Sequence, residues 1–272
     1  MNRSALAFIL AALLAISGTA AAQLASPDIA EHETGYSKIQ YVGSGKLLYN
    51  FHWTSARFLK DGKTFVRIDA KGDNDLTGAK RIDWTEETLL EIAGPTVRSV
   101  YWKKKSTGAE RMTWSLDYDW TAKKADYQYN DEATGKKEAK KIDLKDGAVG
   151  GDALQVALRG FPFEKGAGTQ FKSQIVTGDG MLIDGSIIFR GEETIVTPAG
   201  PIETYRLELK PSGALGLVAP KMLYWFAKAK PHAWIRYEGR DEGLTNPRTR
   251  NFLVEFDPKE CFAPKPVQEA PK

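Results

Sequence analysis

Catalysis near neutral pH needs a side chain that titrates there, and histidine is the residue type that ordinarily does so. The chain has three: His32, His52 and His232. No G-x-S-x-G motif and no S-x-x-K pair accompanies them, so the sequence lacks an activated serine. His52 lies between Phe51 and Trp53 in an expected strand, which favours a structural role. The histidines therefore predict no hydrolytic triad.

Metal ligands and paired carboxylates are the next candidates. His32 lies between two glutamates, but neighbours on an extended segment point in opposite directions, so we expect no metal site and no cofactor there. Asp117 and Asp119 share one face of an expected strand, about 7 Å apart. That spacing suits glycoside hydrolysis in a cleft. A solvent-facing acidic row is the favoured interpretation, with a glycan-active hydrolase as a lesser alternative.

Lysines cluster in two places, at 103–105 and at positions 136, 137, 140 and 141. Such clusters can contact an anionic membrane surface or a glycan. They also keep sheet edges from pairing with other chains, and the interspersed acids favour that second reading. The whole chain has 38 basic and 35 acidic residues, so its net charge is small, which argues against dedicated nucleic-acid binding.

Aromatic residues are the strongest indication of a ligand, because they make up 11% of the chain and include seven tryptophans. A curled sheet that points them inward either packs solidly or leaves an apolar cavity. If a cavity exists, we expect this lining: Trp114, Leu116, Tyr118, Trp120, Tyr205, Leu223, Trp225, Trp234 and Arg159. For Arg159, pairing with a carboxylate of the sheet or with the helix dipole is favoured over ligand binding.

The first 22 residues are typical of a secretory signal peptide. Arg3 precedes an apolar run from Ala5 to Ile16, and small residues end the segment at Ala22. The run is short for a membrane span and no second one follows, so we expect cleavage near Ala22 and no membrane span. Cys261 is the only cysteine, which excludes an intramolecular disulfide. The prediction is a periplasmic or secreted protein.

Alternation of apolar and polar residues predicts an all-β fold. The run from Met112 to Trp120 places every second, large apolar side chain on one face. Turn pairs such as Asp61-Gly62 and Asp179-Gly180 separate the expected strands, which predicts antiparallel hairpins. We expect ten to twelve strands in a curled meander sheet or half-barrel, or in two packed sheets.

One short helix interrupts this pattern. Asp152 is the expected N-cap, residues 153–159 suit a helix, and Gly160 suits its end. The apolar run at 222–226 is ambiguous, with a buried strand favoured over a helix. The predicted organisation is a signal peptide at 1–22, a single antiparallel β domain at 23–256, and a flexible proline-rich tail at 257–272.

Five passages in the second half of the chain are distinctive: GDALQVALR at 151–159, GEETIVTPAG at 191–200, TYRL at 204–207, YWF at 224–226 and WIRYE at 234–238. Together they resemble one family of exported bacterial proteins, the domain of unknown function 3108. The resemblance implies an antiparallel, curled sheet exported to the periplasm, similar in outline to lipoprotein-carrier half-barrels. It implies no catalytic residues. The turn at 228–232 departs from the family pattern, where an acidic residue is expected.

These observations predict a periplasmic, non-catalytic binding or carrier protein for an amphiphilic or lipid-like ligand. The alternative is an envelope scaffold or assembly factor that binds another envelope protein. A void lined by aromatic side chains would favour carriage, and an interdigitated interior would favour a scaffold.

Overall fold

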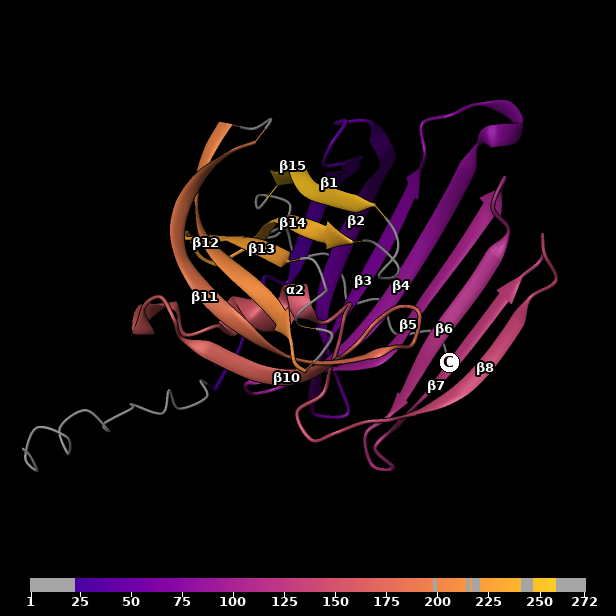
Figure 1. The fold of residues 1–272 in the computed structure, drawn as a ribbon. Helices are drawn as coiled ribbons and strands as arrows, with labels where there is room; N and C mark the ends of the chain where they lie inside the picture. The colour runs from indigo at the N-terminus through magenta and orange to yellow at the C-terminus, as the bar shows by residue number, and fades with distance from the viewer. Residues whose placement is uncertain (1–22, 198–199, 214–215, 217–220, 241–246, 258–272) are drawn as a thin grey trace, which may run out of the picture.

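The structure is a computed structural model and describes residues 23–197, 200–213, 216, 221–240 and 247–257. Fifteen strands form one sheet in the order β8-β7-β6-β5-β4-β3-β2-β1-β15-β14-β13-β12-β11-β10-β9 (Figure 1). The strands are β1 (His32–Tyr41), β2 (Leu47–Lys60), β3 (Lys63–Asp73), β4 (Ile82–Ala93), β5 (Thr96–Gly108), β6 (Met112–Asp119), β7 (Lys124–Asp131), β8 (Lys137–Asp143), β9 (Val149–Gly150), β10 (Gln170–Val176), β11 (Leu182–Thr197), β12 (Gly200–Pro211), β13 (Met222–Ala227), β14 (Trp234–Arg240) and β15 (Arg248–Asp257).

The predicted meander is confirmed. Neighbouring strands of the sheet pair antiparallel, except that the two-residue β9 runs parallel to β10. The consecutive strands β8 and β9 lie at opposite ends of the sheet, and β1 pairs with β15. At the β2–β3 hairpin, Asp61 and Gly62 both have positive φ, as a tight two-residue turn requires. The strand count exceeds the ten to twelve expected. The apolar segment at 222–226 is the predicted strand, as part of β13.

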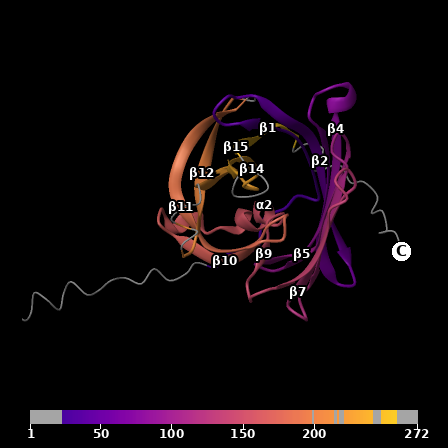
Figure 2. The ribbon, with the colours of Figure 1, turned by 45° about the vertical axis from the view of Figure 1, so that its right-hand side comes forward.

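The sheet curls without closing into a barrel. Strands β10 to β15 bend round with β1, while β3 to β8 run side by side as a broader extension (Figures 1 and 2). We call this extension, β3 to β8, the wing. The chain between β9 and β10 enters the curl and forms α2 (Leu154–Ala157), with 3₁₀ turns at Leu158–Gly160 and Phe163–Lys165. A third 3₁₀ turn, Gly78–Lys80, lies between β3 and β4.

The curl is filled by side chains. Leu154, Val156 and Leu158 of the helical segment are at most 3% exposed. They belong to one buried cluster with Val66 of β3 and Phe226 of β13. The ring of Phe163 stacks on Tyr205 with centroids 4.1 Å apart. A two-turn helix has little stability of its own, so this packing holds it in place.

The wing has a separate core on its inner face. Met112, Trp114 and Leu116 of β6 are buried there together with residues of β7 and β8. The turn between β10 and β11 covers them, because a Cβ built on Gly178 would lie 3.0 Å from Trp102 and 3.3 Å from Trp114. A third cluster includes Ile195 of β11, Trp225 of β13 and Leu253 of β15.

The helix differs from its prediction at the N-terminus. The cap position belongs to Ala153, and no side chain caps it. Asp152 was the expected cap, but its Oδ1 accepts a hydrogen bond from Ser99 of β5 instead, at 2.8 Å. The reason is tertiary, since burial against β5 brings the serine hydroxyl within reach.

Three predictions fall outside the described residues. The signal peptide occupies 1–22, and Cys261 lies in the predicted tail. The centre of the expected turn at 197–200, Pro198 and Ala199, is also outside them.

Candidate functional site

The structure divides the predicted ligand-lining residues among the three buried clusters. Trp114 and Leu116 belong to the wing core, with Tyr118 and Trp120 packed against it. Tyr118 and Trp120 stack on each other, and the Trp120 indole donates to the carbonyl of Ser99 at 2.7 Å. All four side chains come from one face of β6 and its end, as the alternation predicts.

The remaining lining residues lie elsewhere. Tyr205 and Trp234 belong to the interior of the curl, and Leu223 and Trp225 belong to the third cluster. Trp225 is 3% exposed, donates its indole N–H to Glu193, and lies under the guanidinium of Arg236, 4.5 Å from its ring centroid. The structure thus brings these residues together in small packed groups and not around one shared space.

Arg159 forms a buried ion pair with Glu33 of β1. Its Nη1 and Nη2 donate to the two carboxylate oxygens at 2.6 and 2.8 Å, and the side chains are 6% and 1% exposed. Such a bidentate pair fixes both partners in position. It anchors the end of the helical segment to the first strand, which is the favoured prediction for this arginine.

The candidate catalytic groups are engaged in structural contacts. His52 is exposed on β2 and stacks on Tyr36 with centroids 4.6 Å apart. Asp117 lies 3.5 Å from the ammonium of Lys103, and Asp119 accepts two backbone N–H groups of the β6–β7 turn. Over the described part of the chain, no group of three His, Cys, Asp or Glu side chains is arranged to hold a metal ion.

One ionisable group is buried without a counter-charge beside it. Asp152 is 6% exposed, and Ser99 Oγ is the hydrogen-bond donor to its Oδ1. Burial raises the pKa of Asp152 to about 7, against the opposing effect of the Ser99 hydrogen bond. Burial and the charge of Asp152 likewise raise the pKa of Tyr118. These groups converge on Gly150, where a Cβ would lie 2.2 Å from both Asp152 Oδ1 and Ser99 Oγ.

The outer face of the sheet carries a broad polar surface. Across strands β2 to β8, the positions that alternate with the buried aromatics point outward in register. One row follows the cross-strand pairs through His52, Lys71, Thr85, Lys105, Thr113, Asn130 and Lys137, which we call the lysine row. The next row, called the mixed row, contains Thr54, Asp69, Glu87, Lys103, Ser115, Gln128 and Ala139.

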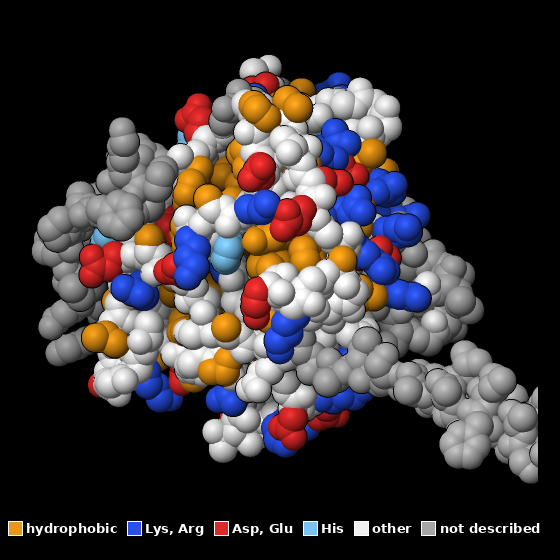
Figure 3. Space-filling model, turned by 90° about the vertical axis from the view of Figure 1, so that its left-hand side faces the viewer, with side chains coloured by type: hydrophobic (Ala, Val, Ile, Leu, Met, Phe, Trp, Pro, Cys, Tyr) orange, Lys and Arg blue, Asp and Glu red, His pale blue; other side chains and the backbone are white. Residues whose placement is uncertain are grey.

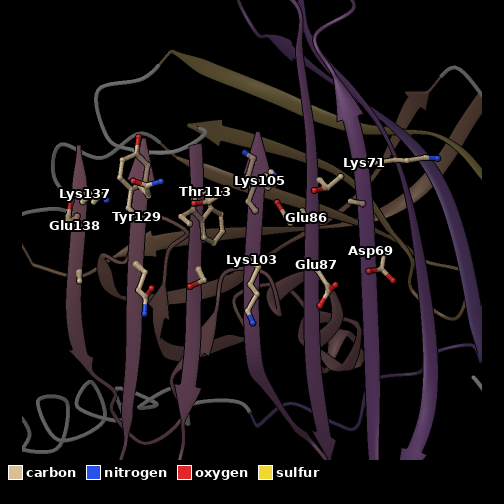
Figure 4. Close-up of a pocket in the computed structure, with 18 of the residues that line it drawn as sticks. Asp69, Lys71, Glu86, Glu87, Lys103, Lys105, Thr113, Tyr129, Lys137 and Glu138 are labelled. Atoms are coloured by element: carbon tan, nitrogen blue, oxygen red, sulfur yellow. The ribbon is translucent and has the colours of Figure 1, made fainter. Parts of the chain in front are cut away.

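The two rows line an open groove with a volume of about 1140 Å³. Figure 4 shows how the labelled side chains follow one another from β3, with Asp69 and Lys71, to β8, with Lys137. A second hollow of about 670 Å³ adjoins it and shares His52, Lys71 and Lys105. The groove therefore extends over most of the wing.

The two rows differ in charge. In the mixed row, Arg67 lies 2.9 Å from Asp69 and 2.8 Å from Glu87, so their charges are largely compensated. In the lysine row, no described carboxylate lies within 4.0 Å of the ammonium groups of Lys71, Lys105 or Lys137. The lysine row is thus a line of three cations separated by hydroxyl and amide groups.

The opposite side of the molecule has a different character. Figure 3 shows basic, acidic and apolar side chains interspersed over the curled half.

At the free edge of the wing, β8 has β7 as its neighbour and carries Lys137, Lys140 and Lys141. Lysines on an edge strand can keep it from pairing with other chains, which is the role that the sequence favours for this cluster.

A family model matches residues 51–241, described as a protein of unknown function, DUF3108. The chain belongs to this DUF3108 family. The match covers the wing, α2 and the strands to β14, and confirms the resemblance carried by the motifs at 151–159 and 191–200. No curated protein matches the chain.

Three solved structures align with this DUF3108 protein over most of its length. A β-barrel-like protein of the DUF1849 family from Brucella abortus aligns with a TM-score of 0.50 at 7% identity, over 85% of this chain and 98% of its own. A protein described as exported, with a YmcC-like fold, from Bacteroides fragilis has a TM-score of 0.36 at 9% identity, over 87% and 100%. A protein from Parabacteroides distasonis that is described as a lipoprotein also has a TM-score of 0.36, at 10% identity over 87% and 100%. The first likeness supports the curled β fold.

The sequence signals find part of the outer face. Lys103, Lys105 and Lys137 lie in the two lysine clusters that are visible in the sequence. Lys71 and Thr85 belong to neither cluster. Only the register of β3 to β8 places them in one row.

Within the described ranges, no helix is long and apolar enough to cross a membrane.

Proposed function

We propose that this protein is an exported, non-catalytic binding protein of the bacterial cell envelope, and that it binds its ligand on the outer face of the wing. The observation that carries the proposal is the open groove of about 1140 Å³ along the two polar rows. Export is supported by the signal-peptide pattern of the first 22 residues.

The filled interior of the curl favours the outer face of the wing as the place where the ligand binds. The helical segment occupies the curl, with Leu158 and Phe226 both fully buried against its walls. Protein interiors packed in this way leave few voids larger than a water molecule. The predicted carriage of an amphiphile would require the segment to leave the curl and to break the Arg159–Glu33 pair.

Lysine footprinting tests the proposal. The protein is acylated briefly with and without a fractionated envelope extract, and modification of each lysine is measured by mass spectrometry. We expect the extract to protect Lys71, Lys105 and Lys137, while the exposed Lys172 and Lys210 of the curled half, on β10 and β12, react unchanged. Equal reactivity of both sets with every fraction would contradict binding on the wing.

The carrier hypothesis has a separate measurement. Native mass spectrometry of protein purified gently from its own cells detects a retained lipid by its mass. A lipid adduct that disappears on delipidation, combined with an unprotected wing, would favour carriage over the proposal made here. An apo mass with a protected wing would favour the outer face.

A further inference from the structure

We infer that the ligand of the outer face is an acidic polysaccharide, which lies across the strands with its anionic groups at Lys71, Lys105 and Lys137. This inference rests on the proposed function of the wing and names the class of molecule that it binds. Three features of the groove carry it: the spacing of the cations in the lysine row, the groups between them, and the carboxylates of the mixed row.

The spacing of the cations fits a polymer whose charges are separated by neutral units. Neighbouring strands lie about 4.8 Å apart, so Lys71 on β3 and Lys105 on β5 are about 10 Å apart along the row, and Lys105 and Lys137 on β8 are about 14 Å apart. Each strand of double-helical DNA carries a phosphate about every 3.4 Å along the helix axis, which is far denser than this row. An acidic polysaccharide can place neutral sugars between its charged groups.

The groups between the lysines suit sugar hydroxyls. Thr85 lies between Lys71 and Lys105, and Thr113 and Asn130 lie between Lys105 and Lys137. Hydroxyl and amide side chains both donate and accept hydrogen bonds, as sugar hydroxyls do. The row therefore alternates sites for anions with sites for neutral polar groups.

The mixed row argues against an anionic membrane surface as the occupant. Asp69 and Glu87 border the same groove and would repel a dense layer of lipid phosphates. A polysaccharide can instead donate its hydroxyls to these carboxylates, which Arg67 holds in place. The arrangement thus favours a ligand with separated charges and many hydroxyl groups.

Binding of hyaluronate, in which each uronate is followed by a neutral sugar, is measured with the whole protein by isothermal titration calorimetry at several salt concentrations and tests the inference. We expect binding that weakens as salt increases, and no binding of neutral dextran. The triple variant K71Q/K105Q/K137Q should bind about tenfold more weakly, since exposed ion pairs contribute about 0.2–1 kcal/mol each. The matched control K165Q/K172Q/K210Q removes the same charge from exposed positions of the curled half and should bind like the wild type.

Several outcomes would overturn the inference. They are equal affinities of the triple variant and its control for hyaluronate, equal binding of dextran and hyaluronate, or binding of phosphatidylglycerol vesicles without binding of hyaluronate. Unchanged urea-unfolding midpoints for both variants exclude misfolding as the cause of a loss. If hyaluronate does not bind while an envelope fraction still protects Lys71, Lys105 and Lys137, the ligand class is wrong and the proposed function stands. If calorimetry detects no binding and footprinting detects no protection, both the inference and the proposed function are wrong.

Discussion

Arg159 and Glu33 form a buried bidentate ion pair across 126 residues of sequence. The arginine ends the helical segment inside the curl, and the glutamate comes from β1. The N–H of Ala25 adds a second tie to this point by donating to the carbonyl of Gly160 at 2.7 Å. The start of the described chain and the end of the helix are thus held together at one side of the interior.

Removing one partner of this pair should destabilise the fold strongly. Arg159→Met leaves the Glu33 carboxylate buried without compensation, so we expect a loss of about 3–5 kcal/mol in the free energy of unfolding. The double variant E33L/R159M replaces both charges by apolar groups and should lose less than either single variant. Urea unfolding followed by tryptophan fluorescence measures the free energy of unfolding of Arg159→Met, Glu33→Leu and the double variant. Single variants that lose less than about 1 kcal/mol would show that the pair is solvated.

Asp152 predicts a pH dependence of stability. Its pKa is about 7 in the folded state and about 3.9 in an unfolded chain, so the folded state binds more protons between these values. The contribution of this group is fully present below pH 4, declines as pH rises from about 4 to 7, and is lost above its folded pKa. Asp152→Asn should remove that decline.

The measurement is the free energy of unfolding at intervals from pH 4 to pH 8, compared between the wild type and Asp152→Asn. Asp117→Asn, an exposed carboxylate on the outer face, provides the control and should keep the wild-type slope. Identical slopes for Asp152→Asn and the wild type would show that Asp152 is ionised in the folded state throughout this range.

Gly150 should not tolerate a methyl group. An alanine Cβ at this position would lie 2.2 Å from Ser99 Oγ and from Asp152 Oδ1. Displacing these groups should cost about 1–3 kcal/mol, as overpacking of cores does. Gly43→Ala is the control, because no atom lies within 4 Å of its Cβ position. A shift in the unfolding midpoint for Gly43→Ala as large as that for Gly150→Ala would contradict the steric explanation.

The wing core should depend on Leu116, which is fully buried. Leu116→Ala should cost about 2–5 kcal/mol through lost burial and a cavity. Leu59, at the end of β2, is 72% exposed, and Leu59→Ala should change stability by less than about 0.5 kcal/mol. Thermal or urea unfolding compares the two. Similar losses for both variants would mean that the wing core is loosely packed.

The sequence determined most of the local structure. Alternation from Met112 to Asp119 predicted both the strand and its buried face, because a two-residue period allows one apolar side. Asp61-Gly62 predicted a hairpin turn for the same local reason, since both residues adopt positive φ. The fold class and the family followed from such short-range signals.

Tertiary structure decided what these elements build. Nothing local to Asp152 indicates that Ser99, 53 residues earlier, takes the place of the helix N-terminus as its hydrogen-bond partner. Likewise, Lys71 and Lys137 share a row because six strands pair in one register, and a shift of one residue would turn either side chain to the other face. The sequence alone determined which residues alternate, while the pairing of distant strands decided that the helix fills the curl and that the lysines line one groove.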